Sequence, residues 1–160
     1  MLKKTPVADY DELLQKGSQP DAYRPTMYDF LDFNALQFYS SGEQAGAKAQ
    51  DAFELSSEDP VFDSEAKFIA WQIKTTDTES RTVKALKLYQ DLLKFHANDE
   101  DKSAYIDASL GRLNFGKNKA YGESKNDRYR TAIKGFINKW ADHRISARAR
   151  FHLAQSLDQE

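Results

Sequence analysis

The stretch that decides the fold is TDTESRTVKALKLYQDLLKFH (76–96), which is followed by the polar run NDED (98–101) and by SAYIDASLGRLNF (103–115). Two segments rich in apolar residues thus flank four polar ones. This is the pattern of two helices joined by a short turn, so we predict a helical hairpin over 76–115.

The first segment has the period of an amphipathic helix. Its apolar residues recur at steps of three and four, which places them on one face: Val83, Leu86, Tyr89 and Leu93. Thr76 and Glu79 have the spacing of a capping box, in which two side chains satisfy backbone donors of the first helical turn. This predicts a helix that begins near Asp77.

The second segment places Ile106, Leu110 and Leu113 on one face. Small residues lie beside that face, among them Ala108 and Gly111. Because small side chains allow two helix backbones to approach closely, we expect the two segments to pack against each other.

Composition limits the class of protein. The chain has 160 residues, a net charge of -2, 40% hydrophobic residues and no cysteine. This length and composition fit one globular domain over 1–160. Disulfides, thiol nucleophiles and zinc–thiolate sites are excluded, and no apolar run approaches the ~18 residues that suggest a transmembrane helix.

Over the rest of the chain, apolar spacing and helix-capping residues predict an all-α protein with six substantial helices and one short one. Thr26 with Asp29 repeats the capping-box spacing, and Asp59 before Pro60 is a typical helix start. The predicted elements are the first helices over 8–41, with a short one at 8–16, central helices over 59–75 and 76–115, and a last hairpin over 126–160. We expect GKNKAYGESKN (116–126) to be an exposed linker, and 43–58 stays unassigned.

The helices repeat a spacing. Ala85-x3-Tyr89 and Ala132-x3-Phe136 match the second-helix pattern of tetratricopeptide repeats, and Leu110-Gly111 stands where the next first helix has its pair. The chain therefore resembles that class, and the resemblance implies antiparallel hairpins stacked as a right-handed superhelix. The same spacing also suits any closely packed helix pair, so both interpretations stay open.

A second resemblance is carried by RPTMYDFLDFNALQFYSS (24–41), AFELSSEDPVF (52–62) and KALKLYQDLLKFHAND (84–99). These strings resemble the helical N-terminal region of large alpha-2-macroglobulin family proteins of the Bacteroides type. The resemblance implies a fragment of an exported, envelope-associated protease trap; if the chain is complete, we expect a cytoplasmic protein. The family's thioester cysteine has no counterpart here, and no functional residue of the family carries over.

The sequence contains no constellation that indicates chemistry. His96, His143 and His152 lack the i, i+4 spacing of a helical metal site, and we expect them at helix ends or on the surface. The acidic run 99–101 lacks the glycine and alternating ligands of a calcium loop, so we interpret it as a cap with solvated charges. We predict no catalytic, metal-binding or cofactor-binding residue, no cofactor and no enzyme.

Charge is distributed unevenly along the chain. Residues 116–152 contain ten lysines and arginines but three acidic residues. A basic face there can attract an acidic partner or a polyanion, or it can dock on the acidic half of the chain itself or on the next domain. The candidate partner-binding residues are Lys134, Lys139, Arg144, Arg148 and Arg150.

The leading functional hypothesis is a non-enzymatic helical-repeat module for protein interaction or scaffolding. Its partners would be neighbouring domains of the same polypeptide or another protein. The alternative is a polyanion or nucleic-acid binding module that uses the basic 116–152 face. Nucleic acid is disfavoured, because Tyr129, Phe136 and Trp140 belong to the predicted core stripe and are not available to stack on bases.

Overall fold

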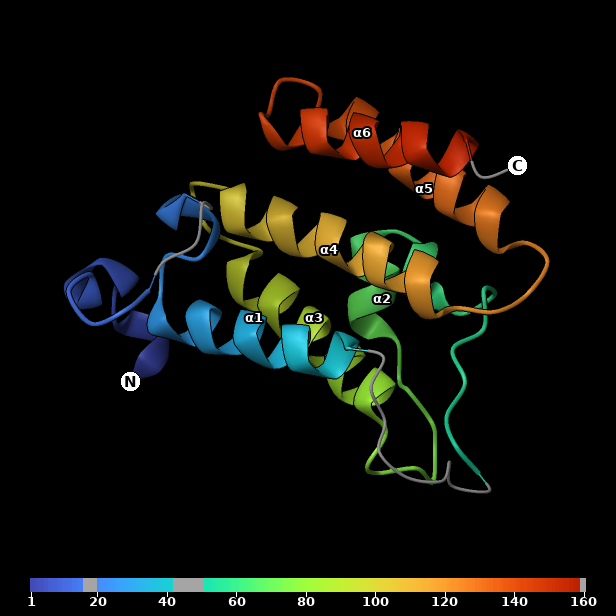
Figure 1. Ribbon diagram of the computed structural model, residues 1–160, viewed down its shortest axis with the longest axis horizontal. Helices are drawn as coiled ribbons and strands as arrows, with labels where there is room; N and C mark the ends of the chain where they lie inside the picture. The colour runs from blue at the N-terminus through green and yellow to red at the C-terminus, as the bar shows by residue number, and fades with distance from the viewer. Residues whose placement is uncertain (16–19, 42–50, 159–160) are drawn as a thin grey trace.

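The computed structural model describes residues 1–15, 20–41 and 51–158, and in these ranges it is all-α, as predicted (Figure 1). The described residues form no strand, only isolated bridges between Pro6 and Thr26 and between Ser56 and Tyr121. The α-helices are α1 (Met27–Ser40), α2 (Glu65–Ala70), α3 (Arg81–His96), α4 (Ser103–Lys119), α5 (Lys125–Lys139) and α6 (Ile145–Leu157). Short 3-10 turns are η1 (Leu2–Lys4), η2 (Val7–Tyr10), η3 (Asp21–Tyr23) and η4 (Pro60–Phe62).

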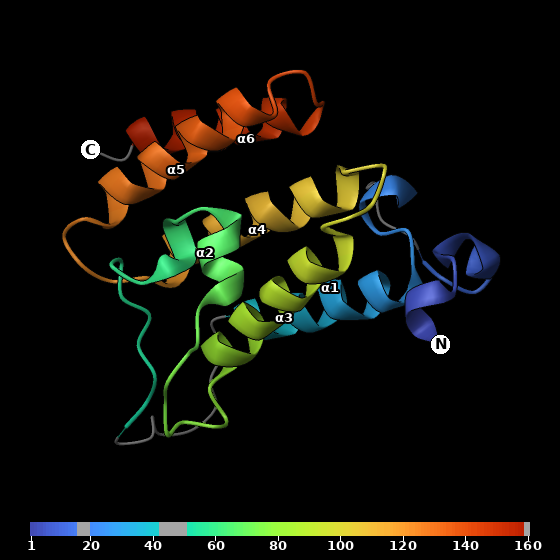
Figure 2. The ribbon, with the colours of Figure 1, turned by 180° about the vertical axis from the view of Figure 1, so that it is seen from behind.

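The longer helices form a row. α1 packs on α3, α3 on α4, α4 on α5 and α5 on α6, and the short α2 also packs on α3. Figures 1 and 2 show the α5–α6 pair at one end of this row, beyond α4. The hairpins α3–α4 and α5–α6 are therefore present, whereas a right-handed superhelix stays a prediction.

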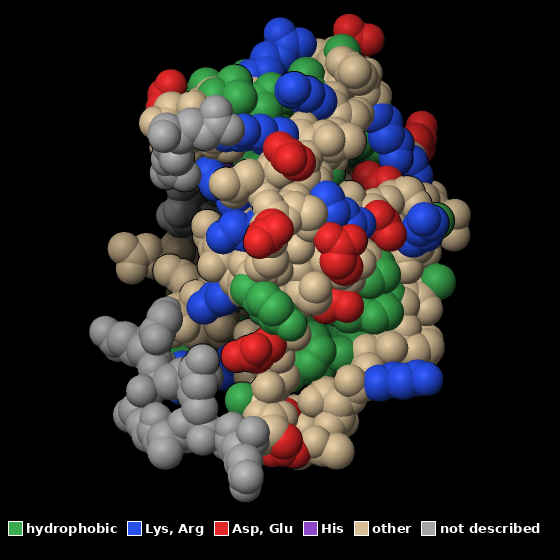
Figure 3. Space-filling model, turned by 90° about the vertical axis from the view of Figure 1, so that its right-hand side faces the viewer, with side chains coloured by type: hydrophobic (Ala, Val, Ile, Leu, Met, Phe, Trp, Pro, Cys, Tyr) green, Lys and Arg blue, Asp and Glu red, His purple; other side chains and the backbone are tan. Residues whose placement is uncertain are grey.

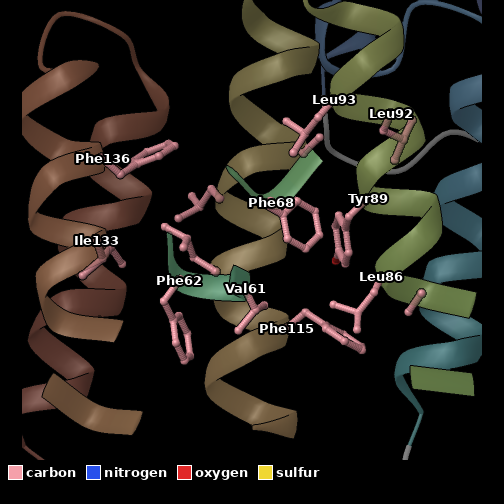
Figure 4. Packing of buried hydrophobic residues seen from close by; sticks show 14 of the residues in the cluster. Val61, Phe62, Phe68, Leu86, Tyr89, Leu92, Leu93, Phe115, Ile133 and Phe136 are labelled. Atoms are coloured by element: carbon pink, nitrogen blue, oxygen red, sulfur yellow. The ribbon is translucent and has the colours of Figure 1, made fainter. Parts of the chain in front are cut away.

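One continuous core runs through this row of helices. Tyr89 of α3 packs on Gly111 of α4, where an added Cβ would lie 3.1 Å from the ring atom Cε1. Figure 4 shows Ile133 and Phe136 of α5 pointing toward α4 from one side and the side chains of α3 from the other. The small residue at 111 thus lets the aromatic ring lie between two closely packed helices.

The predicted start of α3 is wrong by about one turn. Ser80 caps this helix, and its hydroxyl oxygen accepts a hydrogen bond from Val83 N at 3.3 Å. Thr76 and Asp77 instead bind the preceding segment: Thr76 donates to Asp51, and Asp77 accepts from Phe53 N at 3.0 Å. These long-range contacts compete with the local capping box and prevail.

The predicted helix over 59–75 is also wrong. Pro60 begins only the turn η4, and α2 starts after Ser64 and ends at Ala70. The Gln90 side chain of α3 donates hydrogen bonds to the carbonyl oxygens of Phe68 and Trp71, at 2.7 and 2.9 Å. Because these carbonyls have partners outside the helix, the chain can leave α2 in extended conformation.

The predicted exposed linker 116–126 is shorter than expected: residues 121–123 are exposed and connect α4 to α5, but the residues before them belong to α4 or are buried. α4 continues to Lys119, and Gly116 is buried against η4. Tyr121 then pairs with the earlier segment, because its N–H donates to Leu55 O at 3.0 Å and its carbonyl accepts from Ser57 N at 2.7 Å. Residues 55–57 and 120–121 therefore hold each other in place.

Near the N-terminus the prediction holds in part. The capping box of α1 is present, with Thr26 and Asp29 bonded to each other's backbone N–H groups. The expected helix at 8–16 is only the turn η2, and Gly17 and residues 43–50 of the unassigned 43–58 lie outside the described residues. Phe38 of α1 is 58% exposed, although its spacing from Met27 and Leu31 would place it on an apolar face.

Candidate functional site

The five predicted basic residues do not form a set of free charges. Lys139 Nζ lies 3.1 Å from Glu65 Oε2, and Arg148 forms an ion pair with Asp107. The guanidinium of Arg144 lies over the Tyr23 ring, 5.4 Å from its centroid. Lys134 and Arg150 are exposed. Three of the five thus contact groups of the chain itself.

Arg128, another residue of the basic region, is also bound internally. Its Nη2 lies 2.7 Å from Asp63 Oδ1, and its Nη1 lies 3.5 Å from Glu58 Oε2. Figure 3 shows lysine, arginine and acidic side chains intermingled on that side of the molecule. Among the roles that the sequence left open for the basic segment, these contacts are of the kind expected for docking on the acidic half of the chain itself.

A cleft of about 210 Å³ separates α2, α4 and α5. Within it the Glu65 carboxylate accepts hydrogen bonds from Ser109 Oγ at 2.9 Å and Lys139 Nζ at 3.1 Å. Burial raises the pKa of Glu65, but the backbone hydrogen bond, Lys139 and Ser109 lower it further than burial raises it, so the net shift is downward. The carboxylate is therefore ionised, and its hydrogen bonds link α2 to α4 and α5.

Arg112 of α4 lines the same cleft and is only 2% exposed. Its Nη1 donates to Asp63 O at 2.9 Å, and its guanidinium lies 4.9 Å from the centroid of the Phe68 ring. Burial lowers the pKa of Arg112 to about 10, and the charges of Glu65, Tyr105 and Asp63 offset only part of this effect. The cation is thus packed into the core between α2 and α4.

His96 was expected at a helix end or on the surface: it is the last residue of α3, but it is buried, with 1% of its surface exposed. Its Nε2 lies 2.7 Å from Asp29 Oδ1 at the start of α1, and its Nδ1 lies 2.6 Å from Asp99 Oδ2 after the end of α3. With a carboxylate at each ring nitrogen, the imidazole holds both protons. Burial lowers the pKa of His96, but the bonds to Asp29 and Asp99 raise it above its ordinary value.

This arrangement was only partly visible in the sequence. His96 continues the buried spacing of Tyr89 and Leu93, so a position facing the core could have been inferred. Asp29 already had a local role as a cap, and nothing in its own segment indicates a partner 67 residues away. The acidic run 99–101 was interpreted as a cap with solvated charges. Asp101 does accept a hydrogen bond from Ser103 N at the start of α4, at 2.8 Å, whereas Asp99 is hydrogen-bonded to the buried imidazole.

The outer face of α6 carries an exposed row of apolar side chains. Ala147, Phe151 and Ala154 all lie on it and are exposed, Phe151 by 59%. The inner face carries Ile145 and Ala149, which are buried. The A-x3-aromatic spacing of Ala147 and Phe151 thus recurs on an exposed face, and it was not among the instances singled out from the sequence.

The described ranges contain neither a metal-binding group nor a membrane-spanning helix. Within 1–15, 20–41 and 51–158, no three histidine or acidic side chains gather as a metal-binding group. In those ranges no helix is both long and apolar enough to cross a bilayer. Comparison of the chain with protein-family models, curated proteins and solved structures gives no match in any of the three.

Proposed function

We propose that this chain is a non-enzymatic helical module for protein interaction or scaffolding. Its α5–α6 end would engage a neighbouring domain of the same polypeptide or another protein. The observation that carries the proposal is the uncovered apolar stripe of α6, formed by Ala147, Phe151 and Ala154. Elsewhere in the chain the same spacing is buried between helices, as at Tyr89.

The internal ion pairs count against a polyanion-binding function. Arg128, Lys139 and Arg148 already lie beside carboxylates of the chain itself. A polyanion would have to compete with those carboxylates for each cation. Binding driven by phosphate or sulfate contacts would therefore be weak.

The family resemblance extends the proposal to a particular context. We propose that the chain belongs to the N-terminal region of an alpha-2-macroglobulin-like envelope protein, in which it spaces or docks domains of a protease trap. The support is the resemblance of 24–41, 52–62 and 84–99. Sequencing the surrounding reading frame tests it: an upstream signal peptide and long downstream β-domains would support it, and stop codons at both ends would contradict it.

Titration with heparin and with duplex DNA separates the proposed function from the alternative. At about 50 mM and about 200 mM salt we expect little binding of either polyanion. Tight, salt-dependent binding that is lost when Arg144, Arg148 and Arg150 are changed to glutamate would contradict the interaction-module proposal. The unfolding transition of that variant must be recorded in parallel, because Arg148 also binds Asp107.

A further inference from the structure

Arg112 is a buried cation with hydrogen-bond donors to spare. It is 2% exposed and lines the cleft between α2, α4 and α5. Among the described residues, only its Nη1 has an acceptor, the carbonyl oxygen of Asp63 at 2.9 Å, and its Nε is buried without one. Buried polar groups nearly always have a hydrogen-bond partner, and buried charges are nearly always paired. The remaining donors of Arg112 therefore suit an acceptor from outside the chain.

The carboxylates nearest to Arg112 are paired with other cations. Asp63 Oδ1 lies 2.7 Å from Arg128 Nη2. Glu65 Oε2 lies 3.1 Å from Lys139 Nζ. Over the part of the chain that the structure describes, neither carboxylate forms an ion pair with Arg112. These two pairs balance their own charges, which leaves the charge of Arg112 uncompensated beside the cleft.

The donors without an acceptor share one edge of the guanidinium. Nε and Nη2 of an arginine point in the same direction, at the spacing of the two oxygens of a carboxylate. A carboxylate bound at this edge of Arg112 would accept from both nitrogens and would supply the negative charge. A cation would be repelled there.

The rest of the cleft is partly apolar. Leu113 and Phe136 line it, and Figure 4 shows the Phe136 side chain extending from α5 toward α4. Gly135 lines it as well, and a Cβ built at this position meets no atom within 4 Å. The volume of about 210 Å³ lies below the ~300 Å³ at which pockets for drug-sized ligands begin. The lining therefore fits a small molecule with an apolar body.

We propose that the cleft between α2, α4 and α5 binds a small monocarboxylic acid with an apolar body, whose carboxylate pairs with Arg112. A phosphate or a dicarboxylate fits less well, because its second charge would face the ionised Glu65. This site shares no residue with the apolar stripe of α6, so it goes beyond the proposed function.

The test uses benzoate as the probe, because it joins one carboxylate to an apolar ring. In NMR spectra of the isotope-labelled full chain, the Nε–H signal of Arg112 reports directly on a bound carboxylate. We expect benzoate to shift this signal saturably, with a dissociation constant of about 1 mM. Benzamide, which has the same shape without the charge, should bind about tenfold more weakly. Inorganic phosphate, which lacks the apolar ring, should also bind more weakly.

Two leucine substitutions on α5 form a matched pair. Gly135→Leu places a side chain in the cleft and should abolish the benzoate shift. Asn138→Leu adds the same side chain outside the cleft and should leave the affinity unchanged. Both positions are exposed, so each variant should keep the amide spectrum of the folded chain. Arg112→Met should also abolish binding, and Gly135→Leu decides the matter if that variant does not fold.

Loss of benzoate binding in Gly135→Leu, together with its retention in Asn138→Leu, would support the site. The proposal is overturned if benzoate gives no saturable shift at Arg112, in which case the cleft takes up solvent only. It is also overturned if benzamide or phosphate binds as tightly as benzoate, or if Gly135→Leu binds benzoate as the wild type does. None of these outcomes bears on the interaction module.

Discussion

At the scale of single residues, His96 shows how a side chain expected at a helix end or on the surface can join distant parts of the fold. Its ring links the first turn of α1 to the end of α3 through Asp29 and Asp99. Asp29 is fully buried and is hydrogen-bonded both to the imidazole and to the backbone N–H and hydroxyl of Thr26. Lys3, Asp32 and Asp91 stand in the same region but are not bonded to the ring.

This arrangement predicts a particular pH dependence of stability. Because the folded-state pKa of His96 is raised, the ion pairs contribute fully below the ordinary value of 6.5 and are lost as pH rises through the folded pKa. His96→Gln should therefore destabilise the protein by about 3 kcal/mol at pH 6, and by less at alkaline pH.

Urea unfolding of the wild type and of His96→Gln across this range checks the prediction. The difference between the two proteins isolates the contribution of His96, since His152, whose pKa burial lowers, is common to both. A difference in unfolding free energy that stays constant from pH 6 to alkaline pH would contradict the ion pairs described here.

At the scale of elements, periodicity located the long helices well but not the short ones. α3, α4, α5 and α6 follow their apolar steps, because each buries one face against a neighbour. α2 and the segment around Tyr121 were misjudged because tertiary hydrogen bonds decide them: Gln90 binds the carbonyls at the end of α2, and Leu55 accepts from Tyr121. No local pattern contains such partners.

Two glycines in helices provide a matched pair. An alanine Cβ at Gly116 would lie 2.8 Å from Phe62 Cε1 and 2.9 Å from Val61 Cγ2, whereas nothing lies within 4 Å of one at Gly135. Gly116→Ala should destabilise the protein by about 1–3 kcal/mol through overpacking. Gly135→Ala should stabilise it by about 1 kcal/mol through helix propensity.

Chemical denaturation of the two glycine variants measures both effects on the same scale. Opposite signs are the expected result. If Gly116→Ala were as stabilising as Gly135→Ala, the contact between α4 and η4 would not be as close as described.

The A-x3-aromatic spacing gives a second matched pair, because Tyr89 is 7% exposed and Phe151 is 59% exposed. Tyr89→Ala should cost about 3–5 kcal/mol of unfolding free energy, since it empties a core site; Phe136→Ala, also buried, belongs to the same class. Phe151→Ala should change it by less than about 0.5 kcal/mol. Thermal or urea unfolding distinguishes these values, and similar losses at 89 and 151 would mean that α6 is buried differently.

At the scale of the whole molecule, the all-α class and the two hairpins could be predicted from apolar spacing, whereas the candidate surface could not. The candidate binding residues were selected because lysine and arginine are abundant in 116–152. Folding places Lys139 beside Glu65 and Arg148 beside Asp107, and these distant partners could not be inferred from the sequence.

The exposed apolar stripe of α6 could not be predicted from the sequence for a similar reason. The apolar spacing of Ala149, Leu153, Ala154 and Leu157 indicates a helix, but of these Ala149 is buried and Ala154 and Leu157 are exposed. Which side of α6 stays uncovered depends on how α5 and α4 pack on it.

The most direct test of the central claim is the accessibility of the α6 stripe in the assembled protein. The chain has no cysteine, so Phe151→Cys provides a single thiol, and Asn138→Cys is the exposed control. In the purified chain, a membrane-permeant maleimide should label both variants rapidly. In the protein's own cells, we predict that labelling at 151 becomes much slower while labelling at 138 does not; equal labelling at both positions would contradict the interaction module.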